Sequence, residues 1–291
     1  MVRHGAALDE PLAAALERVT AQDRAFVQQL AYGTLRQYFR LEAILDQTLA
    51  RPLKKKDGDI RALLLCGLHQ LLDMRTPDHA AISSTVEACR ALGKPWATGL
   101  VNGVLRRCSR EAEQLESRLP DNARLNHPAW LIAELEKAWP GLWQAAIEAG
   151  NRHPPMCLRV NTRRLSRDDY LGKLHDSGLA GRACDLSSAG IRLDEPVDVG
   201  RLPGFADGLV SIQDEAAQMA APLLRLAAGQ RVLDACAAPG GKTGHILELE
   251  GELAAAVAMD VSEARLGRVA DNLRRLGLAA ELLSGDARSA P

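Results

Sequence analysis

The chain has 291 residues, 25% of them charged, and a formal net charge of −1 at pH 7. This length allows two or three domains with cores of their own, and the near-neutral charge excludes a protein that holds nucleic acid by bulk positive charge, although a local basic patch stays open. No apolar run approaches the roughly 18 residues of a membrane span and no signal-peptide pattern begins the chain, so we expect a cytoplasmic protein.

Helical periodicity runs through residues 9–118. Apolar residues recur three and four positions apart, most clearly at Ile60, Leu64, Leu68 and Leu71. Thr20 is expected to cap the helix that follows it, and a turn at residues 76–78 to start a new helix. The pattern predicts a bundle of about five helices.

Basic residues gather at two places in this helical region. The first is a connection between helices and the second is the end of a later helix; the set is Arg36, Arg40, Lys54, Lys55, Lys56, Arg106 and Arg107. One interpretation is a solvated surface, with the arginines at the helix end favoured by the helix dipole. The other is a surface that contacts RNA phosphates, whose binding would depend steeply on salt.

The middle of the chain changes character after the turn-rich residues 120–126. Two helices are predicted over residues 130–139 and 142–149, followed by a strand in residues 154–162 (PPMCLRVNT) after a proline break. A helix over 168–177 and short strands at 191–193 and 209–212 complete a small α+β module. Arg159 and Asn161 lie on the same side of their strand, where they either anchor the module to the next domain or contact RNA directly.

The most informative stretch is residues 231–243 (RVLDACAAPGGKT). It predicts a buried strand, a Pro-Gly-Gly loop and a helix from about Thr243, which is typical of a nucleotide-type ligand site. A P-loop would need glycine at position 236, where Cys236 stands, and the Gly-x-Gly-x-x-Gly pattern of dinucleotide folds is absent. The third interpretation is the S-adenosylmethionine loop of a Rossmann-like methyltransferase.

Acidic residues downstream favour this third interpretation. Asp260 ends a second apolar strand, and Asp286 follows a short third strand at residues 281–284. Open α/β sheets bind ligands at the carboxyl ends of their strands, where both acids and Asp234 fall. The alternative is that Asp is simply favoured in the turns after strands.

Residues 234–243 (DACAAPGGKT) resemble the first motif of the RNA 5-methylcytosine methyltransferases, and residues 210–218 (VSIQDEAAQ) are similar to the segment that precedes that motif. Other methyltransferases carry a glycine-richer loop, so the match is specific. Residues 30–36 (LAYGTLR) and 101–107 (VNGVLRR) look like the signature segments of a NusB-like RNA-binding domain, which begins the branch of this family that modifies bacterial 16S rRNA.

The resemblance implies a multidomain fold. We expect an all-α NusB-like helical bundle in residues 1–125, linker helices and a small α+β module similar to an RNA-recognition fold in 126–208, and a partial Rossmann-like α/β methyltransferase domain in 209–291. The implied substrate is 16S rRNA or a small-subunit precursor, bound by a monomer without a membrane. The implied cofactor is S-adenosylmethionine, with Asp260 on its ribose, Asp286 near its adenine, and its other contacts from Cys236, Ala237, Ala238, Pro239, Gly240, Gly241 and Lys242.

Members of this family methylate cytosine C5 through a cysteine adduct, because C5 is not nucleophilic in the free base. The two expected motifs, Asp-Ala-Pro-Cys and Thr-Cys, are absent from this sequence. The nucleophile is therefore expected beyond Pro291, the chain is predicted to be a fragment that transfers no methyl group alone, and its first catalytic-domain strand should form an uncovered apolar edge. The six cysteines form no Cys-x-x-Cys pair, so neither a metal site nor a disulfide framework is indicated.

Two other functions stay open on the sequence alone. One is a non-enzymatic RNA-binding protein with a degenerate cofactor domain. RNA binding without affinity for the cofactor would support this function. The other is a P-loop nucleotidase, which Cys236 weakens and which Mg-dependent ATP binding would support.

Overall fold

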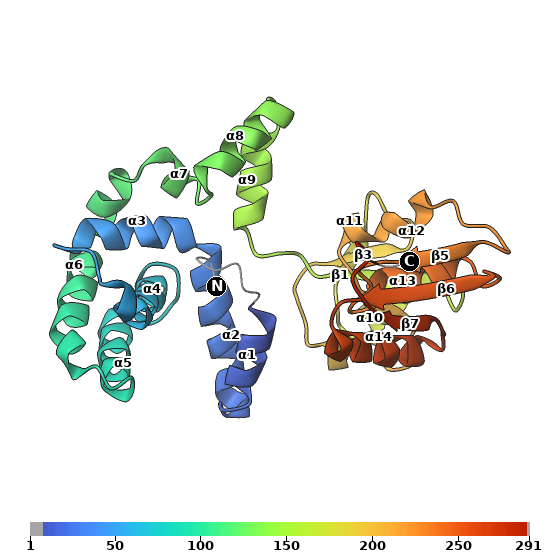
Figure 1. Cartoon of the computed structure of the whole chain (residues 1–291), viewed down its shortest axis with the longest axis horizontal. Coiled ribbons are helices and arrows are strands. Elements are labelled where there is room, and N and C mark those ends of the chain that lie inside the picture. Colours follow the sequence, from blue (N-terminus) through green and yellow to red (C-terminus); the bar gives the residue numbers. More distant parts are fainter. Residues whose placement is uncertain (1–7, 290–291) are drawn as a thin grey trace. The chain divides into compact units, whose positions relative to one another are not determined.

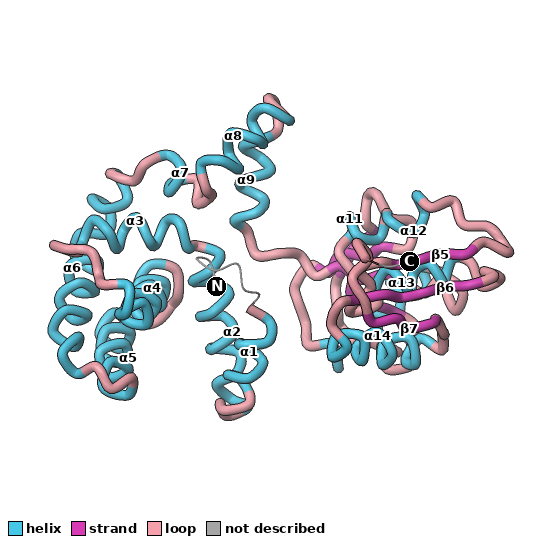
Figure 2. The backbone as a smooth tube through the Cα atoms, in the orientation of Figure 1, coloured by secondary structure: helices cyan, strands magenta, loops and turns pink. Residues whose placement is uncertain are grey.

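The computed structural model describes residues 8–289 and divides the chain into two compact units, one ending at His153 and the other beginning at Pro154. Figure 2 shows that all the strands lie in the second unit, whereas the first is helical throughout. We refer to them as the helical unit and the sheet unit. Among residues 8–289, no helix is long and apolar enough to cross a membrane.

The helical unit packs its helices around one leucine-rich core (Figure 1). Fully buried side chains such as Leu41, Leu64 and Leu105 come from different helices. In α4, Ile60, Leu64 and Leu68 recur four residues apart, so this helix turns one apolar face inward. The helices of this part are α1 (Asp9–Leu16), α2 (Ala21–Arg36), α3 (Tyr38–Thr48), α4 (Gly58–Leu72), α5 (Asp78–Ala91) and α6 (Thr98–Ser117), with 3-10 turns at Lys55–Asp57 and Pro95–Ala97.

The helical prediction for residues 9–118 is confirmed, but its details differ. The structure has one helix more than the five expected, since the chain turns at Gln37 and separates α2 from α3. Thr20 precedes α2 as predicted, yet its hydroxyl donates to the Asp23 carboxylate (Oγ1 to Oδ2, 2.7 Å) and accepts no backbone N–H of the helix.

Three further helices end the helical unit: α7 (Asp121–Arg124), α8 (Ala129–Ala138) and α9 (Trp143–Asn151). Asn126 ties them to the bundle from a left-handed backbone conformation (φ 57°). Its amide donates to the Arg36 carbonyl and to Asn151, and its side-chain oxygen accepts the Arg40 N–H. The predicted boundaries at residues 125/126 and 208/209 stay predictions, but these bonds explain why α8 and α9 group with the bundle.

The sheet unit begins with a four-stranded antiparallel sheet in the order β2-β3-β1-β4. Its strands are β1 (Cys157–Val160), β2 (Gly181–Ala183), β3 (Gly190–Leu193) and β4 (Val210–Ile212), with α10 (Arg167–Asp176) and a 3-10 turn at Val199–Arg201. Leu158, Tyr170, Leu174 and Ile191 form the core between the sheet and α10. β2 is too short and too polar to be recognised in the sequence.

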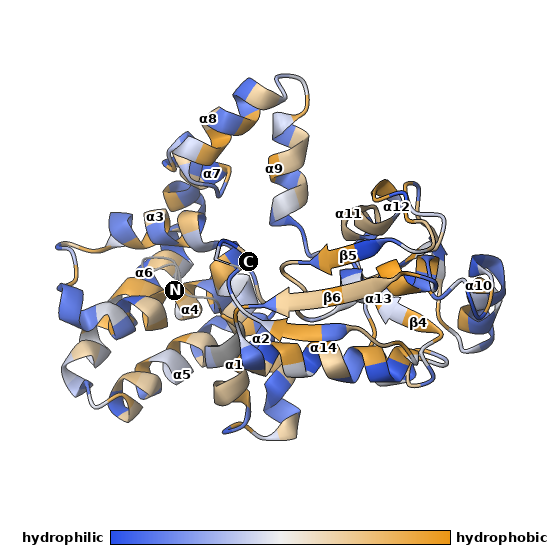
Figure 3. Cartoon of the chain, turned by 45° about the vertical axis from the view of Figure 1, so that its right-hand side comes forward, coloured by the Kyte–Doolittle hydropathy of each residue, from blue (hydrophilic) through white to orange (hydrophobic). Residues whose placement is uncertain are grey.

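A three-stranded parallel sheet follows, in the order β5-β6-β7. It contains β5 (Arg231–Asp234), β6 (Ala255–Asp260) and β7 (Glu281–Ser284), joined by α13 (Gly241–Leu249) and α14 (Glu263–Leu276); α11 (Glu215–Gln218) and α12 (Ala220–Leu223) precede it. Figure 3 shows α14 alternating between hydrophilic and hydrophobic stretches. Leu266, Val269 and Leu273, on its apolar face, pack into the core of this sheet.

The first strand of this sheet corrects one prediction and confirms another. β5 was expected to be buried, but the Leu233 side chain is 52% exposed. β5 pairs only with β6 among residues 8–289, so it is the apolar edge strand that the sequence predicted.

Candidate functional site

The loop between β5 and α13 is shaped by a glycine. Gly240 has φ +99°, and a Cβ at this position would stand 3.2 Å from Cγ1 of Val269 on α14. Its N–H donates to the Ala237 carbonyl (2.6 Å), and the Ala237 N–H donates to the Met259 carbonyl at the end of β6. The loop therefore folds back on the sheet and ends at Gly241, the first residue of α13, two residues before the predicted helix start at Thr243.

Asp260 ends β6 and bonds directly to this loop. Its Oδ2 accepts the Ala238 N–H at 3.2 Å, and its Oδ1 accepts the Ser262 N–H at 3.1 Å and lies 3.5 Å from Arg265. The residue is only 4% exposed. The predicted cofactor acid is thus held by backbone donors beside the predicted cofactor loop, and Oδ2 keeps room for a second donor.

Asp286 lies one step further along the same edge of the sheet. The Gly285 N–H donates to the Asp260 carbonyl (3.1 Å), which joins the ends of β6 and β7. The Asp286 carboxylate pairs with Arg288 at 2.6 Å, and hydrogen bonds from Arg288 hold its pKa below the usual value. A ligand that used Asp286 would share it with Arg288 or displace this arginine.

Thr243 and Cys236 separate this loop from a P-loop. The Thr243 hydroxyl is buried and donates to the Asp234 carboxylate (Oγ1 to Oδ2, 2.7 Å), so it links α13 to β5 where a P-loop would direct it to a magnesium ion. Cys236 is exposed at the position where a P-loop needs its first glycine. Pro239 and Lys242 are also exposed along the loop.

Two of the three predicted RNA-contacting lysines, Lys54 and Lys55, border a hollow of about 490 Å³ in the helical unit. Lys54, Lys55 and Lys56 are exposed and form no ion pair among the residues that the structure describes. Arg61 in the same wall is engaged by Glu42 and Asp46. The hollow is lined by Asp46, Leu49, Pro52, Leu53, Lys54, Lys55, Asp57, Gly58 and Arg61.

Arg106 borders a second hollow, of about 520 Å³, between α5 and α6. Its Nε donates to Asn102 (3.0 Å), while Arg107 beside it pairs with Glu111 at 2.9 Å. His79 and Arg90 also line this hollow; the sequence analysis missed them because they lie far from Arg106 in the chain. The full lining is Asp78, His79, Ile82, Ser83, Val86, Glu87, Arg90, Asn102, Arg106, Ser109 and Arg110.

The two remaining basic residues have different surroundings. Arg40 bridges three helices, because its guanidinium pairs with Asp73 at the end of α4 (2.8 Å) and with Glu116 on α6. Arg36 is half-buried at the end of α2. The predicted set is thus not brought together. Lys54, Lys55 and Arg106 line the two hollows and Arg40 forms an interhelical bridge, whereas Arg36, Lys56 and Arg107 line neither hollow.

Four of the six cysteines have thiols whose pKa is raised by burial. Burial raises the pKa of Cys108 to about 11 and of Cys184 to about 12, and it also raises the pKa of Cys66 and Cys89. Such thiols are poorly ionised near neutral pH and therefore unreactive. Within residues 8–289 there is also no group of three or more His, Cys, Asp or Glu side chains that could hold a metal ion.

Comparison with known sequences matches three family profiles in succession. Residues 2–110 match the NusB family, residues 127–200 match the ferredoxin-like domain of RsmF/B-like methyltransferases, and residues 221–291 match the 16S rRNA methyltransferase RsmB/F family. Ribosomal RNA small subunit methyltransferase B of Pseudomonas syringae pv. tomato is 52% identical over 285 residues, which cover 97% of this chain and 64% of that protein. The same-named protein of Klebsiella pneumoniae is 43% identical over 289 residues, covering 99% of this chain and 67% of that protein.

Solved structures show the same fold. The crystal structure of PH0851 superposes with a TM-score of 0.74 at 21% identity, over 94% of this chain and 63% of that one. A methyltransferase homolog from Pyrococcus horikoshii is 30% identical with a TM-score of 0.50, over 56% of this chain and 53% of the other. The chain thus spans about two thirds of the length of the curated relatives it matches.

Proposed function

Because the chain belongs to the RsmB family of 16S rRNA methyltransferases, we propose that it contributes the RNA-contacting helices and the methyl-donor site of an enzyme that methylates cytosine C5 in 16S rRNA. The observation that carries the proposal is the bond between the Asp260 carboxylate and the Ala238 N–H, which joins the cofactor acid to the cofactor loop. An rRNA substrate also places its action in the bacterial cytoplasm.

S-adenosylmethionine fits the residues at this loop. A Rossmann-like site for this cofactor needs a close backbone turn and a carboxylate for the ribose hydroxyls, without a cradle for a pyrophosphate. Gly240 provides the turn, and the spare acceptor position on Asp260 Oδ2 provides the carboxylate. We propose that residues 236–242 line the cofactor and that Asp286 approaches its adenine.

The bound cofactor would supply a methyl group activated by its positive sulfonium. The chain's own residues would orient it: Asp260 by accepting from the ribose hydroxyls, and the free N–H groups at the start of α13 by facing its polar atoms. Attack at C6 of the base requires a thiolate. We propose that none of the six cysteines of this sequence supplies it, because most are buried and Cys236 belongs to the cofactor loop.

The helical unit would hold the RNA. The exposed lysines Lys54, Lys55 and Lys56 and the arginines around the α5–α6 hollow present positive charge that carboxylates of the described chain neutralise only in part. Phosphate contacts of this kind fix the orientation of an RNA without reading its sequence. Arg36 and Arg107 are proposed to add to this surface, whereas Arg40 contributes mainly to the packing of α3.

Calorimetric titration with S-adenosylmethionine, with Mg-ATP in parallel, tests the cofactor site. We expect binding of S-adenosylmethionine alone, weakened by about tenfold or more in Asp260→Asn because a charge-assisted hydrogen bond is lost. Asp271→Asn is the matched control, since Asp271 is exposed on α14 and pairs only with Arg274. Binding of Mg-ATP in place of S-adenosylmethionine would contradict the proposal and favour a nucleotidase.

The reaction is tested on 16S rRNA incubated with the chain and S-adenosylmethionine labelled in its methyl group. Because none of the six cysteines is proposed to attack C6, we expect nucleoside analysis to find no 5-methylcytidine. Its formation would contradict that proposal, and any other methylated nucleoside would contradict the proposed product. Salt-sensitive RNA binding by a protein with no affinity for S-adenosylmethionine would favour a non-enzymatic RNA-binding protein.

A further inference from the structure

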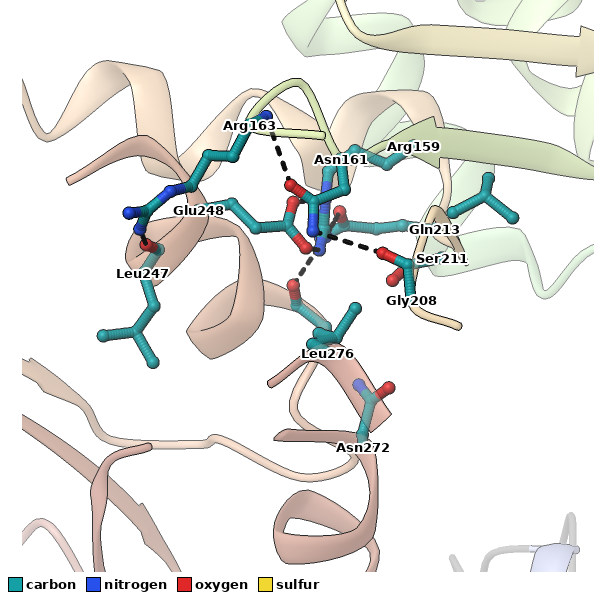
Figure 4. A network of polar contacts seen from close by, with 12 residues as sticks. Arg159, Asn161, Arg163, Gly208, Ser211, Gln213, Leu247, Glu248, Asn272 and Leu276 are labelled. Atoms are coloured by element: carbon teal, nitrogen blue, oxygen red, sulfur yellow. Dashed lines mark hydrogen bonds and ion pairs between the residues drawn. The ribbon is translucent and has the colours of Figure 1, made fainter. Parts of the chain in front are cut away.

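Arginines, not apolar side chains, join the two halves of the sheet unit. The cores of the four-stranded and three-stranded sheets are separate clusters. Between them, Arg163 donates to the Leu247 carbonyl at 3.1 Å, Arg164 donates to the Leu276 carbonyl at 2.9 Å, and Arg275 donates to the Val210 carbonyl at 2.9 Å. Figure 4 shows this polar layer, with Arg159 near its centre.

Arg159 is the most buried member of the layer. It extends from β1, and its side chain is 0% exposed. Nε and Nη2 each donate to one carboxylate oxygen of Glu248 at 2.9 Å, which forms a two-point ion pair with α13. Nη1 donates to the side-chain oxygen of Gln213 and, at 2.7 Å, to the main-chain carbonyl of Gly241.

The sequence of α13 is shaped to accept this side chain. Gly241, Gly244 and Glu248 are spaced three and four residues apart, so they share one face of the helix. A Cβ at Gly244 would stand 3.5 Å from Nη2 of Arg159 and 2.8 Å from Cδ1 of Leu276. The glycine at this position therefore makes room for Leu276, and a Cβ there would lie in ordinary van der Waals contact with the guanidinium.

A hydrogen bond to the Gly241 carbonyl can control the orientation of the next backbone N–H in the proposed cofactor loop. A peptide unit is planar, so fixing the Gly241 C=O also fixes the direction of the Lys242 N–H. This N–H lies in the first turn of α13, where backbone donors have no partner within the helix and are free to meet a ligand. Arg159 thus acts on the loop from the side away from the ligand.

We infer that Arg159 is a positioning residue, through which the four-stranded module orients the first backbone donors of α13 toward the methyl donor. The inference rests on the proposed cofactor site. It makes the small module a structural part of that site, in addition to any contact with RNA.

The test removes the contact to Gly241 without leaving a buried charge. The double variant Arg159→Met/Glu248→Met replaces the ion pair by apolar side chains of similar length, an exchange that folded proteins often tolerate. Hydrogen exchange is measured in the free protein at the Gly240 and Gly244 amides, which are hydrogen-bonded to Ala237 and Gly240 in the loop and first turn. Affinity for S-adenosylmethionine is measured by calorimetry. Arg163→Met is the matched control, because Arg163 bonds a carbonyl at the opposite end of α13.

We expect the double variant to keep the thermal stability of the native chain, while the two amides exchange about tenfold or more faster and S-adenosylmethionine binds about tenfold or more weakly, as for loss of one charged hydrogen bond. The Arg163→Met control should change neither property of the loop. Native exchange at both amides in a folded double variant would overturn the inference and leave Arg159 as packing alone.

Further measurements cover two cases: a double variant that does not fold, and a native chain that does not bind S-adenosylmethionine. If the double variant does not fold, Arg159→Lys replaces it: one ammonium group can pair with Glu248 but cannot also reproduce the separate Nη1 bond to Gly241. Faster exchange at Gly240 and Gly244 supports the inference, and unchanged exchange overturns it. If the native chain binds no S-adenosylmethionine, the proposed cofactor fails, and the exchange rates still decide whether Arg159 orders the loop.

Discussion

The two units use arginine in opposite ways. In the helical unit, Arg40 and Arg61 lie around the outside of a continuous leucine core and pair with carboxylates of other helices. In the sheet unit, Arg159 is fully buried and, like Arg163 and Arg164, bonds main-chain carbonyls between two separate cores.

Arginine therefore contributes to the stability of the two units in different ways. A surface ion pair adds little to stability, because water screens it and long side chains lose freedom. A buried guanidinium must find an acceptor for each N–H donor. The acceptors around it therefore need a defined direction as well as a defined distance. The helical unit is therefore held by apolar packing, whereas the sheet unit is held in part by oriented hydrogen bonds that end at the cofactor loop.

The largest effect should come from breaking the buried pair on one side only. Arg159→Met leaves the Glu248 carboxylate buried at 3% exposure without its partner. We expect the sheet unit to lose about 3 to 5 kcal/mol of unfolding free energy. Hydrogen exchange of the β6 amides in increasing urea measures it, and a loss below about 1 kcal/mol would contradict the buried-charge argument.

The next effect concerns His245 on α13, whose buried Nδ1 has no partner in the described residues. Burial, with a smaller effect of the Arg159 charge, lowers its pKa from 6.5 to about 4. The folded-state pKa is the lower one, so the unfolded chain binds more protons as the pH falls from 6.5 to about 4. Stability present above pH 6.5 should decline by about 1 to 3 kcal/mol across this window.

His245→Leu isolates this contribution. The difference in unfolding free energy between the native chain and the variant should depend on pH only between about 4 and 6.5. A difference that stays constant through this range would show that His245 does not titrate as its burial predicts.

A moderate effect is expected on RNA binding by the helical unit. Replacing Lys54, Lys55 and Lys56 by Gln should weaken affinity by about tenfold at low salt and reduce the slope of log affinity against log salt by about 2, because up to three phosphate contacts are lost. Fluorescence anisotropy with a single-stranded RNA measures both. An unchanged slope would favour a solvated surface over an RNA-contacting one.

The smallest effect should come from Arg40, whose side chain is 20% exposed and is held by Asp73 and Glu116. Arg40→Met should cost the helical unit about 1 kcal/mol of unfolding free energy, since both carboxylates keep access to water. Arg90→Met is the control, because its pair with Glu87 is largely exposed and should contribute almost nothing. A cost similar to that of Arg159→Met would remove the contrast between the two units.

The helices and the cofactor loop were predictable because their signals are local. Helical spacing of Ile60 and the leucines after it identified α4, and the run from Arg231 to Thr243 identified β5, the glycine turn and α13. The acids at the ends of β6 and β7 followed from the same rule of parallel sheets. β2 escaped prediction, since a strand of three residues carries too little pattern.

The sequence by itself thus determined the family, the order of the three matched segments and the glycine turn between β5 and α13, because each depends on a short pattern that is read in one stretch. Only the tertiary structure decided which charges are buried: Gln213 and Glu248 stand far from Arg159 in the chain, and both bond its guanidinium. It also separated the basic residues, of which only some line the two hollows. Burial and pairing depend on contacts between distant segments, which spacing along one segment does not contain.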